Sequence, residues 1–178
     1  MNRTSASLAY DDLIDRGKVS HDSSQRHALQ RLDHLADRLV QRNVWSGGRK
    51  SLFRRQSWER PEWGLYLWGG VGRGKTFLMD LFADSLPGGT FIRLHFHRFM
   101  NKIHQRLMEL QGHENPLEIV ADEFARRGKV LCLDECFVSD IADAMVLGTL
   151  FDALFRRGVA LVTTSNIQPE NLYEGGLQ

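Results

Sequence analysis

Cysteine is scarce in this chain, and long apolar runs are absent. The only two cysteines among its 178 residues are Cys132 and Cys136, which are too few for a framework of disulfides. They do not form a C-x-x-C pair, and Cys132 stands within an apolar run, so we expect buried, reduced thiols. No stretch approaches the roughly 18 consecutive apolar residues of a membrane-spanning helix. The first 30 residues are polar and contain no apolar core of a secretory signal, which favours a cytoplasmic protein.

Proline is also rare, and no repeat is present. The 4 prolines and 16 glycines follow no period, which excludes collagen-like and mucin-like chains. What is present is a globular composition, with 42% hydrophobic and 25% charged residues. A domain typically has about 150 residues, so the length fits one domain with an additional arm.

The net charge of +1 conceals an asymmetry between the two parts of the chain. Residues 1–63 hold 12 Lys and Arg against 8 Asp and Glu, whereas residues 64–178 hold 11 against 14. Most of the positive excess comes from Arg42, Arg49, Lys50, Arg54, Arg55 and Arg60. We interpret this segment as a solvated basic linker, and contact with phosphate or an anionic lipid surface is the alternative.

The N-terminal third predicts a tail followed by a helical arm. Residues 1–21 show no periodicity, so we expect a flexible tail. Asp22 or Ser23 is suited to cap a helix that ends near Gln41, and residues 22–60 then form this helical arm and the basic linker. One apolar stripe runs along the helix at spacings of three and four, formed by Leu29, Leu32, Leu35, Ala36, Leu39 and Val40.

Residues 61–178 alternate between short apolar runs and helical patterns. We expect strands over 65–68, 91–96, 130–133 and 159–163, and helices over 75–86, 98–111, 116–127 and 140–157. Asp140 is a candidate N-cap for the last of these helices, and Gly158 is its stop signal. Strand–helix alternation predicts an α/β domain with a mostly parallel sheet flanked by helices.

The strongest chemical signal is the run Gly69-Gly70-Val71-Gly72-Arg73-Gly74-Lys75-Thr76. It satisfies G-x-x-x-x-G-K-[ST] between a predicted strand and a predicted helix, which is the context that a phosphate-binding P-loop requires. Glycines allow consecutive N–H groups to form a concave nest, and the helix adds its positive dipole end. Lys75 is expected to reach the β- and γ-phosphates, and Thr76 offers a hydroxyl to Mg²⁺.

The second signal is a pair of carboxylates directly after an apolar strand, Asp134 and Glu135. In P-loop enzymes an acid at this place holds Mg²⁺, so we assign Asp134 to the metal. A neighbouring acid suits the role of general base toward the attacking water, which we assign to Glu135.

The third signal is the polar run Thr163-Thr164-Ser165-Asn166 at the end of the fourth predicted strand. A polar side chain there is placed to face the γ-phosphate and to orient the water. Asn166 is our candidate, with Thr164 or Ser165 as alternatives. Ordinary turn chemistry also favours Ser and Asn at such a position.

Taken together, these segments resemble the ZapE-type ATPases, which belong to the wider AAA+ group. The resemblance runs from about residue 24 to the last residue, and the segment LHFHRFM (94–100) is specific to the family. Further segments that carry the resemblance are GLYLWGGVGRGKT (64–76), LDECFVSDI (133–141), TSN (164–166), Pro169 and YEGGLQ (173–178). Cys136 departs from the family, which usually has Phe there; this removes an aromatic group and no ligand.

The resemblance implies a function and a set of site residues. ATP would be bound by Gly69, Gly70, Val71, Gly72, Arg73, Gly74, Lys75, Thr76 and Phe77, with Mg²⁺ at Thr76 and Asp134. Glu135 would activate water, Asn166 would act as a sensor, and Lys75 would take part in catalysis. Bacterial members are cell-division proteins, which implies a division-ring partner, a possible homo-oligomer, and a cytoplasmic or peripheral position at the division site on the inner membrane.

The family also continues beyond the region that this chain covers. Its sheet order is 5-1-4-3-2, so the resemblance implies that the fifth strand, a C-terminal helical part and the arginine finger are missing here. Three functions stay open: an ATP hydrolase coupled to a division partner, a nucleotide-dependent binding module with negligible hydrolysis, and a loader-like nucleic-acid helper that uses the basic linker.

Several residues remain without an assigned role. His95 and His97 would share one face of a strand, where a metal site and a polar strand end are the two alternatives. Arg93 and Arg98 are suited to nucleotide, partner or carboxylates, and Arg73 to solvent or a neighbouring subunit. An aromatic group consists of Trp45, Phe53, Trp58, Trp63 and Tyr66, which suit base stacking, arm packing or a wall for adenine.

Overall fold

The computed structural model describes residues 4–41 and 64–172 of the chain. The basic segment 42–60, the C-terminal motif 173–178 and four of the aromatic residues therefore lie outside the described residues. These aromatic residues are Trp45, Phe53, Trp58 and Trp63.

A parallel four-stranded sheet forms the centre of the domain. Its order is β1-β4-β3-β2, which confirms the order expected for these four strands and places the P-loop strand at an edge of the described sheet. The strands are β1 (Gly64–Trp68), β2 (Phe91–His95), β3 (Val130–Asp134) and β4 (Ala160–Ser165). All of β3 is buried, as its continuous apolar run requires for a central parallel strand.

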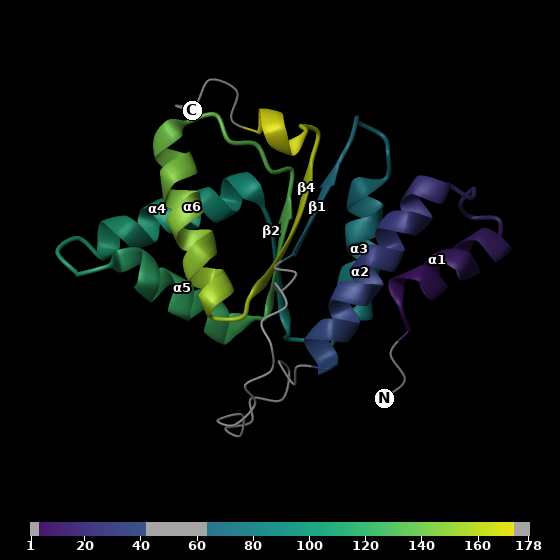
Figure 1. Cartoon of the computed structure of the whole chain (residues 1–178), viewed down its shortest axis with the longest axis horizontal. Helices are drawn as coiled ribbons and strands as arrows, with labels where there is room; N and C mark the ends of the chain where they lie inside the picture. The colour runs from purple at the N-terminus through teal and green to yellow at the C-terminus, as the bar shows by residue number, and fades with distance from the viewer. Residues whose placement is uncertain (1–3, 42–63, 173–178) are drawn as a thin grey trace.

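Helices cover both faces of this sheet and give three layers (Figure 1). One face carries α1 (Ala6–Asp15), α2 (Ser23–Gln41) and α3 (Lys75–Ser85). The other carries α4 (Phe96–Glu109), α5 (Pro116–Arg127) and α6 (Ile141–Arg156), and a short 3-10 helix, η1 (Pro169–Asn171), follows β4. Successive side chains of β3 alternate between these two cores, as a strand requires.

The predicted caps are confirmed where the structure describes them. The Asp22 carboxylate accepts hydrogen bonds from the backbone N–H groups of Ser24 (2.8 Å) and Gln25 (3.2 Å), so it starts α2. These bonds lower the pKa of Asp22. Asp140 caps α6 in the same way, through the N–H groups of Ala142 (2.7 Å) and Asp143 (3.2 Å).

The flexible tail predicted over residues 1–21 contains a helix in the structure. Residues Ala6–Asp15 form α1, whose Ala6 and Tyr10 are fully buried against α2 and α3. Asp33 of α2 accepts bonds from the N–H groups of Ala6 (2.8 Å) and Ser7 (3.1 Å). The helix is thus fixed by partners distant in sequence, which a search for local periodicity does not detect.

The expectation that His95 and His97 share one face of a strand is also wrong. Strand β2 ends at His95, and α4 begins at Phe96, so the two imidazoles belong to different elements. Phe96 is buried in the core, which fixes this abrupt change from strand to helix.

The carboxyl ends of the parallel strands meet at one end of the sheet, where ligands bind in open α/β folds. The three segments with chemical signals follow β1, β3 and β4, so the topology brings them to this end. None of the helices in the described part of the chain is long and apolar enough to span a membrane.

Candidate functional site

The P-loop connects β1 to α3 as an open turn with left-handed glycines. Gly72 and Gly74 both have φ of +80°, a conformation that disfavours any residue with a Cβ. Gly74 stands at the N-cap of α3 without a side-chain cap, so the helix begins with free N–H groups. A Cβ at Gly70 or Gly72 would meet nothing within 4 Å, so open space adjoins the loop at both positions. The backbone thus has the left-handed glycines and the uncapped helix start that the predicted anion-binding cradle requires.

Lys75 directs its ammonium back across this loop. Its Nζ donates to the carbonyl oxygens of Gly69 (2.6 Å) and Gly70 (2.8 Å), and to Oδ1 of Asn166 (2.9 Å). Partial desolvation lowers the pKa of Lys75. All three partners of the ammonium are oxygen acceptors, and phosphate oxygens could take their place. The contact with Asn166 also joins the loop after β1 to the loop after β4.

The acidic pair after β3 has two very different environments. Asp134 is buried, with 4% of its surface exposed, whereas Glu135 is exposed. Thr164 lies between them: its Oγ1 accepts a hydrogen bond from the Glu135 N–H (3.0 Å) and donates to Oδ1 of Asp134 (3.5 Å). The chain thus fixes one carboxylate and leaves the other to face the solvent.

Glu135 has a strained backbone, with φ of +59°. A non-glycine residue in this region typically costs about 1 kcal/mol or more and persists where its surroundings impose it. The imposing contacts come from β4: the Cys136 N–H donates to the Thr164 carbonyl (2.7 Å), and the Ser165 hydroxyl donates to the Cys136 carbonyl (2.6 Å). Thr164 and Ser165, our alternatives to Asn166, are buried in this linkage, whereas Asn166 is exposed.

One cavity of about 390 Å³ joins most of the predicted residues, but Gly69, Gly70 and Asp134 do not line it. Its walls consist of Val71–Phe77, Glu135 and Thr164–Asn166. Lys75, Glu135 and Asn166 therefore line the same cavity, which confirms that these three predicted positions lie together. The Thr76 hydroxyl and the Asp134 carboxylate are hard oxygen donors of the kind that Mg²⁺ takes, so the donor set fits this ion.

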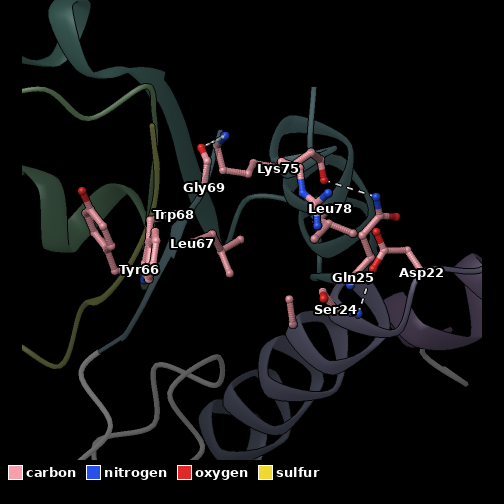
Figure 2. A pocket seen from close by; sticks show the side chains of 11 residues that line it. Asp22, Ser24, Gln25, Tyr66, Leu67, Trp68, Gly69, Lys75 and Leu78 are labelled. Carbon is pink, nitrogen blue, oxygen red and sulfur yellow. Dashed lines mark hydrogen bonds between the residues drawn. The ribbon is translucent and has the colours of Figure 1, made fainter. Parts of the chain in front are cut away.

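A second cavity of about 380 Å³ opens on the arm side of the P-loop (Figure 2). It lies between the start of α2, strand β1 and the loop. Gln25 donates from Nε2 to the Arg73 carbonyl (3.2 Å), and a Cβ at Gly74 would lie 2.8 Å from the same nitrogen. Tyr66 also lines this cavity, and its hydroxyl donates to the Ile167 carbonyl (2.9 Å). No sequence pattern identified Asp22 or Gln25 as neighbours of the loop.

Two P-loop side chains have positions apart from the cradle. The Arg73 side chain is exposed, which agrees with the expectation that it faces solvent. Phe77 packs toward the arm, with its ring centroid 6.3 Å from that of Tyr10. This side chain therefore belongs to the core beneath the loop as well as to the wall of the 390 Å³ cavity.

Arg93 contacts carboxylates, one of the three partners considered from the sequence. Its Nε donates to Oδ2 of Asp134 (2.8 Å), and its Nη1 contacts Asp80 of α3. These two carboxylates raise the pKa of the guanidinium against the lowering effect of its partial burial. The sequence contained a signal for this pairing, because Asp80 follows Thr76 by one helical turn and Arg93 precedes the end of β2 by two residues.

The histidines near this end of the sheet do not gather. His95 and His97 are exposed, and His97 Nε2 lies 3.1 Å from Nδ2 of Asn101. Within residues 4–41 and 64–172, no group of three or more His, Cys, Asp or Glu residues is arranged to hold a metal ion.

Comparisons with known proteins give a consistent family. The family model described as AFG1-like ATPase matches residues 4–178. The Escherichia coli (strain K12) protein named cell division protein ZapE is 46% identical over the whole of this chain and 50% of its own length. A Danio rerio protein named lactation elevated protein 1 homolog B is 43% identical, over 66% of this chain and 26% of its own length. The chain thus spans at most about half the length of these curated relatives.

Solved structures share the fold at low identity. AMPPCP-bound DnaA from Aquifex aeolicus superposes with a TM-score of 0.61 at 17% identity, over 91% of this chain and 44% of that one. PCH-2 from C. elegans gives 0.53 at 19% identity, over 87% of this chain and 42% of the other. These neighbours confirm the P-loop fold with a parallel sheet flanked by helices.

Proposed function

Because the chain belongs to the AFG1-like ATPase family, we propose that it binds Mg²⁺-ATP at the P-loop and hydrolyses it with Glu135. The observation that carries this proposal is the 390 Å³ cavity, in which the P-loop, Glu135 and Asn166 face one another. A phosphate cradle, a general base and a polar sensor are the groups that phosphoryl transfer to water needs.

The phosphates would lie within the turn of Gly69–Thr76. Free N–H groups at the start of α3 and the helix dipole would hold them, together with the ammonium of Lys75. Lys75 would exchange its bonds to the carbonyls of Gly69 and Gly70 for bonds to phosphate oxygens. Its bond to Asn166 would then be released or shared, so the sensor side chain would register an occupied cradle.

Thr76 and Asp134 would hold the metal, which when bound neutralises phosphate charge. Thr76 would offer its hydroxyl, and Asp134 would offer its carboxylate from the end of β3. The buried Asp134 carboxylate forms an ion pair with Arg93, whose Nε lies 2.8 Å from its Oδ2.

Glu135 would accept the proton of the attacking water. The oxygen of that water forms a bond to the γ-phosphorus, the bond from this phosphorus to the β–γ bridging oxygen breaks, and ADP and phosphate leave. Since Glu135 is exposed, its carboxylate is free to meet water in the cavity. Asn166 would orient this water or the γ-phosphate through its amide.

The nucleobase would lie in the 380 Å³ cavity beside the arm, which continues from the P-loop. Asp22, Ser24 and Gln25 supply polar groups there, while Ala28, Leu67 and Leu78 supply an apolar wall.

We further propose that the full protein couples ATP turnover to a protein partner in cell division. The support is the 46% identical relative, which is named a cell division protein. A division-ring protein is then the expected partner, at a cytoplasmic or peripheral position on the inner membrane. Self-association of the full protein would supply the trans-acting arginine that such ATPases use.

Two paired variants test the nucleotide proposal. Lys75→Ala should weaken binding of a fluorescent ATP analogue about 10- to 100-fold, since bonds to charged groups are each worth about 1.5–3 kcal/mol. Lys102→Ala, which removes an exposed lysine on α4, is the matched control and should bind like the parent chain. A parent chain that fails to bind the analogue would end the nucleotide proposal.

Glu135→Gln tests the hydrolysis step. It should keep nucleotide affinity and lower phosphate release from Mg²⁺-ATP about 10²- to 10⁴-fold, the range for loss of a general base. Glu114→Gln, at an exposed carboxylate between α4 and α5, is the matched control. Equal release from the parent chain and from Glu135→Gln would instead favour the nucleotide-dependent binding module.

A further inference from the structure

We propose that Arg93 is a positioning residue that sets the Mg²⁺ affinity of the site by tying Asp134 to α3 through Asp80. The proposal rests on the proposed Mg²⁺-ATP binding and deepens it. It concerns a residue that holds a metal-binding carboxylate in place and does not itself contact metal or nucleotide.

Arg93 is the bridge between two elements that carry metal-binding groups. Its Nε donates to Oδ2 of Asp134 (2.8 Å) at the end of β3, and its Nη1 contacts Asp80 on α3. The side chains are 25% exposed for Arg93, 5% for Asp134 and 52% for Asp80. The pair with Asp134 is therefore mostly shielded from water, and the pair with Asp80 lies at the surface.

The bridge acts on the distance between Thr76 and Asp134. Thr76 and Asp80 are four residues apart on α3, so they stand on the same face of this helix, one turn from each other. Anchoring Asp80 to Arg93 fixes this face of α3 relative to β2. Anchoring Asp134 to the same guanidinium fixes the end of β3 relative to both. The two oxygen donors for Mg²⁺ are thereby held in register by one side chain.

The three bridged side chains also carry a net charge beside the proposed metal position. Oδ2 of Asp134 accepts a hydrogen bond from Arg93, and Oδ1 lies 3.5 Å from the Thr164 hydroxyl. Each neighbour therefore orients one oxygen of the carboxylate. A single arginine between two carboxylates leaves a net charge of −1, which suits a divalent cation beside a polyphosphate. Without Asp80, the arginine would cancel the charge of Asp134. Without Arg93, the two carboxylates would carry −2 and attract a cation more strongly, so the weaker Mg²⁺ binding expected of Arg93→Met is a consequence of lost alignment alone.

An arginine meets this need better than a lysine. The planar guanidinium donates from Nε and Nη in fixed directions, so it can hold two carboxylates at once. Lysine concentrates its charge on one atom and lacks this fork. Arg93→Lys should therefore keep the charge and lose part of the alignment.

The experiment separates metal affinity from nucleotide affinity. Binding of a fluorescent ADP analogue is measured in EDTA and then as a function of MgCl₂ for the parent chain, Arg93→Met, Arg93→Lys and Asp80→Asn. Outer partners of metal ligands are worth about 10- to 100-fold in metal affinity. We expect Arg93→Met to raise the half-saturating Mg²⁺ concentration at least about tenfold, with smaller increases for Arg93→Lys and Asp80→Asn, while the affinity in EDTA changes less than about twofold.

The outcomes distinguish this inference from the proposed function. If the parent chain binds no nucleotide, or gains nothing from Mg²⁺, the proposed function fails and the inference falls with it. If the parent chain gains affinity with Mg²⁺ and the variants show the same midpoint, the inference alone is overturned. An equal loss in EDTA and in Mg²⁺ would reveal a general structural role and would also overturn it. Should Arg93→Met not fold, Asp80→Asn decides, because it leaves the Arg93–Asp134 pair intact.

Discussion

The two helical layers of this domain differ in how they meet the site. The layer of α4, α5 and α6 packs on the sheet through a core centred on Phe99 and is linked at its surface by ion pairs such as Arg157–Glu118 (2.7 Å). The layer of α1, α2 and α3 includes part of the P-loop, because α3 begins with Lys75 and Thr76. Its arm helices lie beside α3, and α2 contacts the loop through Gln25.

This difference separates support from function. We expect a change in the α4–α5–α6 layer to alter how firmly the sheet is held and to leave the geometry of the loop unchanged. A change in the α1–α2–α3 layer alters the base on which the P-loop stands. We therefore expect stability and nucleotide affinity to be uncoupled in the first layer and coupled in the second.

The largest effect should follow from Phe99→Ala. Phe99 is fully buried, with its ring centroid 5.5 Å from that of Phe124 and 6.3 Å from that of Phe151. Removing such a ring leaves a cavity and should lower the free energy of unfolding by about 3–5 kcal/mol in urea denaturation. The nucleotide affinity of the folded fraction should match that of the parent chain.

Phe137→Ala is the control for this substitution, since 57% of Phe137 is exposed and little apolar burial is lost. A drop in nucleotide affinity for folded Phe99→Ala would show that the two layers are not independent, and would contradict the comparison.

A smaller effect on stability, with a distinct effect on binding, should follow from Tyr10→Phe. The buried Tyr10 hydroxyl donates to the Ser20 carbonyl (3.3 Å) and accepts from the Asp22 N–H (3.0 Å), so it fixes the turn between α1 and α2. Loss of these bonds should cost about 1–2 kcal/mol of unfolding free energy. Because Asp22 starts the helix that carries Gln25, nucleotide affinity should also fall, by about twofold to fivefold. A Tyr10→Phe variant with reduced stability and unchanged nucleotide affinity would show that the arm does not affect binding at the P-loop.

The sequence predicted the sheet, and it predicted that the candidate residues lie at the ends of its strands. The P-loop, Asp134–Glu135 and Asn166 each lie at or directly after the end of a strand, and parallel topology alone brings such positions together. Continuous apolar runs identified β3 and β4, because central parallel strands are buried on both faces. The α2 and α5 boundaries were also predicted, since Asp22 and Pro116 are local signals that act within one helical turn.

What the sequence did not reveal depends on partners distant along the chain. Helix α1 owes its position to Asp33, 27 residues from Ala6, and to packing against α3, so its own short segment has little pattern. Strand β2 gives way to α4 at Phe96 because this side chain enters the core, and alternation of His95 and His97 could not show that. The strained Glu135 is imposed from β4, 29 residues away.

The two cysteines offer the finest test of the comparison, because each reports on one layer. Cys132 is buried in the core beneath α1, α2 and α3, and Cys136 in the core beneath α4, α5 and α6. Burial raises the pKa of each thiol to about 12 from an ordinary value of 9.0. Since only the thiolate reacts, both should resist alkylation at pH 8 until the chain opens locally. The same shift makes the folded state lose stability as the pH rises above about 9, where the thiols of the unfolded chain ionise.

Alkylation by iodoacetamide at pH 8, followed by mass spectrometry of the two cysteine peptides, measures each layer separately. Tyr10→Phe should speed modification of Cys132 more than that of Cys136, because it loosens the arm that covers the first core. Each cysteine serves as the internal control for the other in the same sample. Equal changes at both would mean that the chain opens as a single unit, and the two layers would then differ in contacts but not in stability.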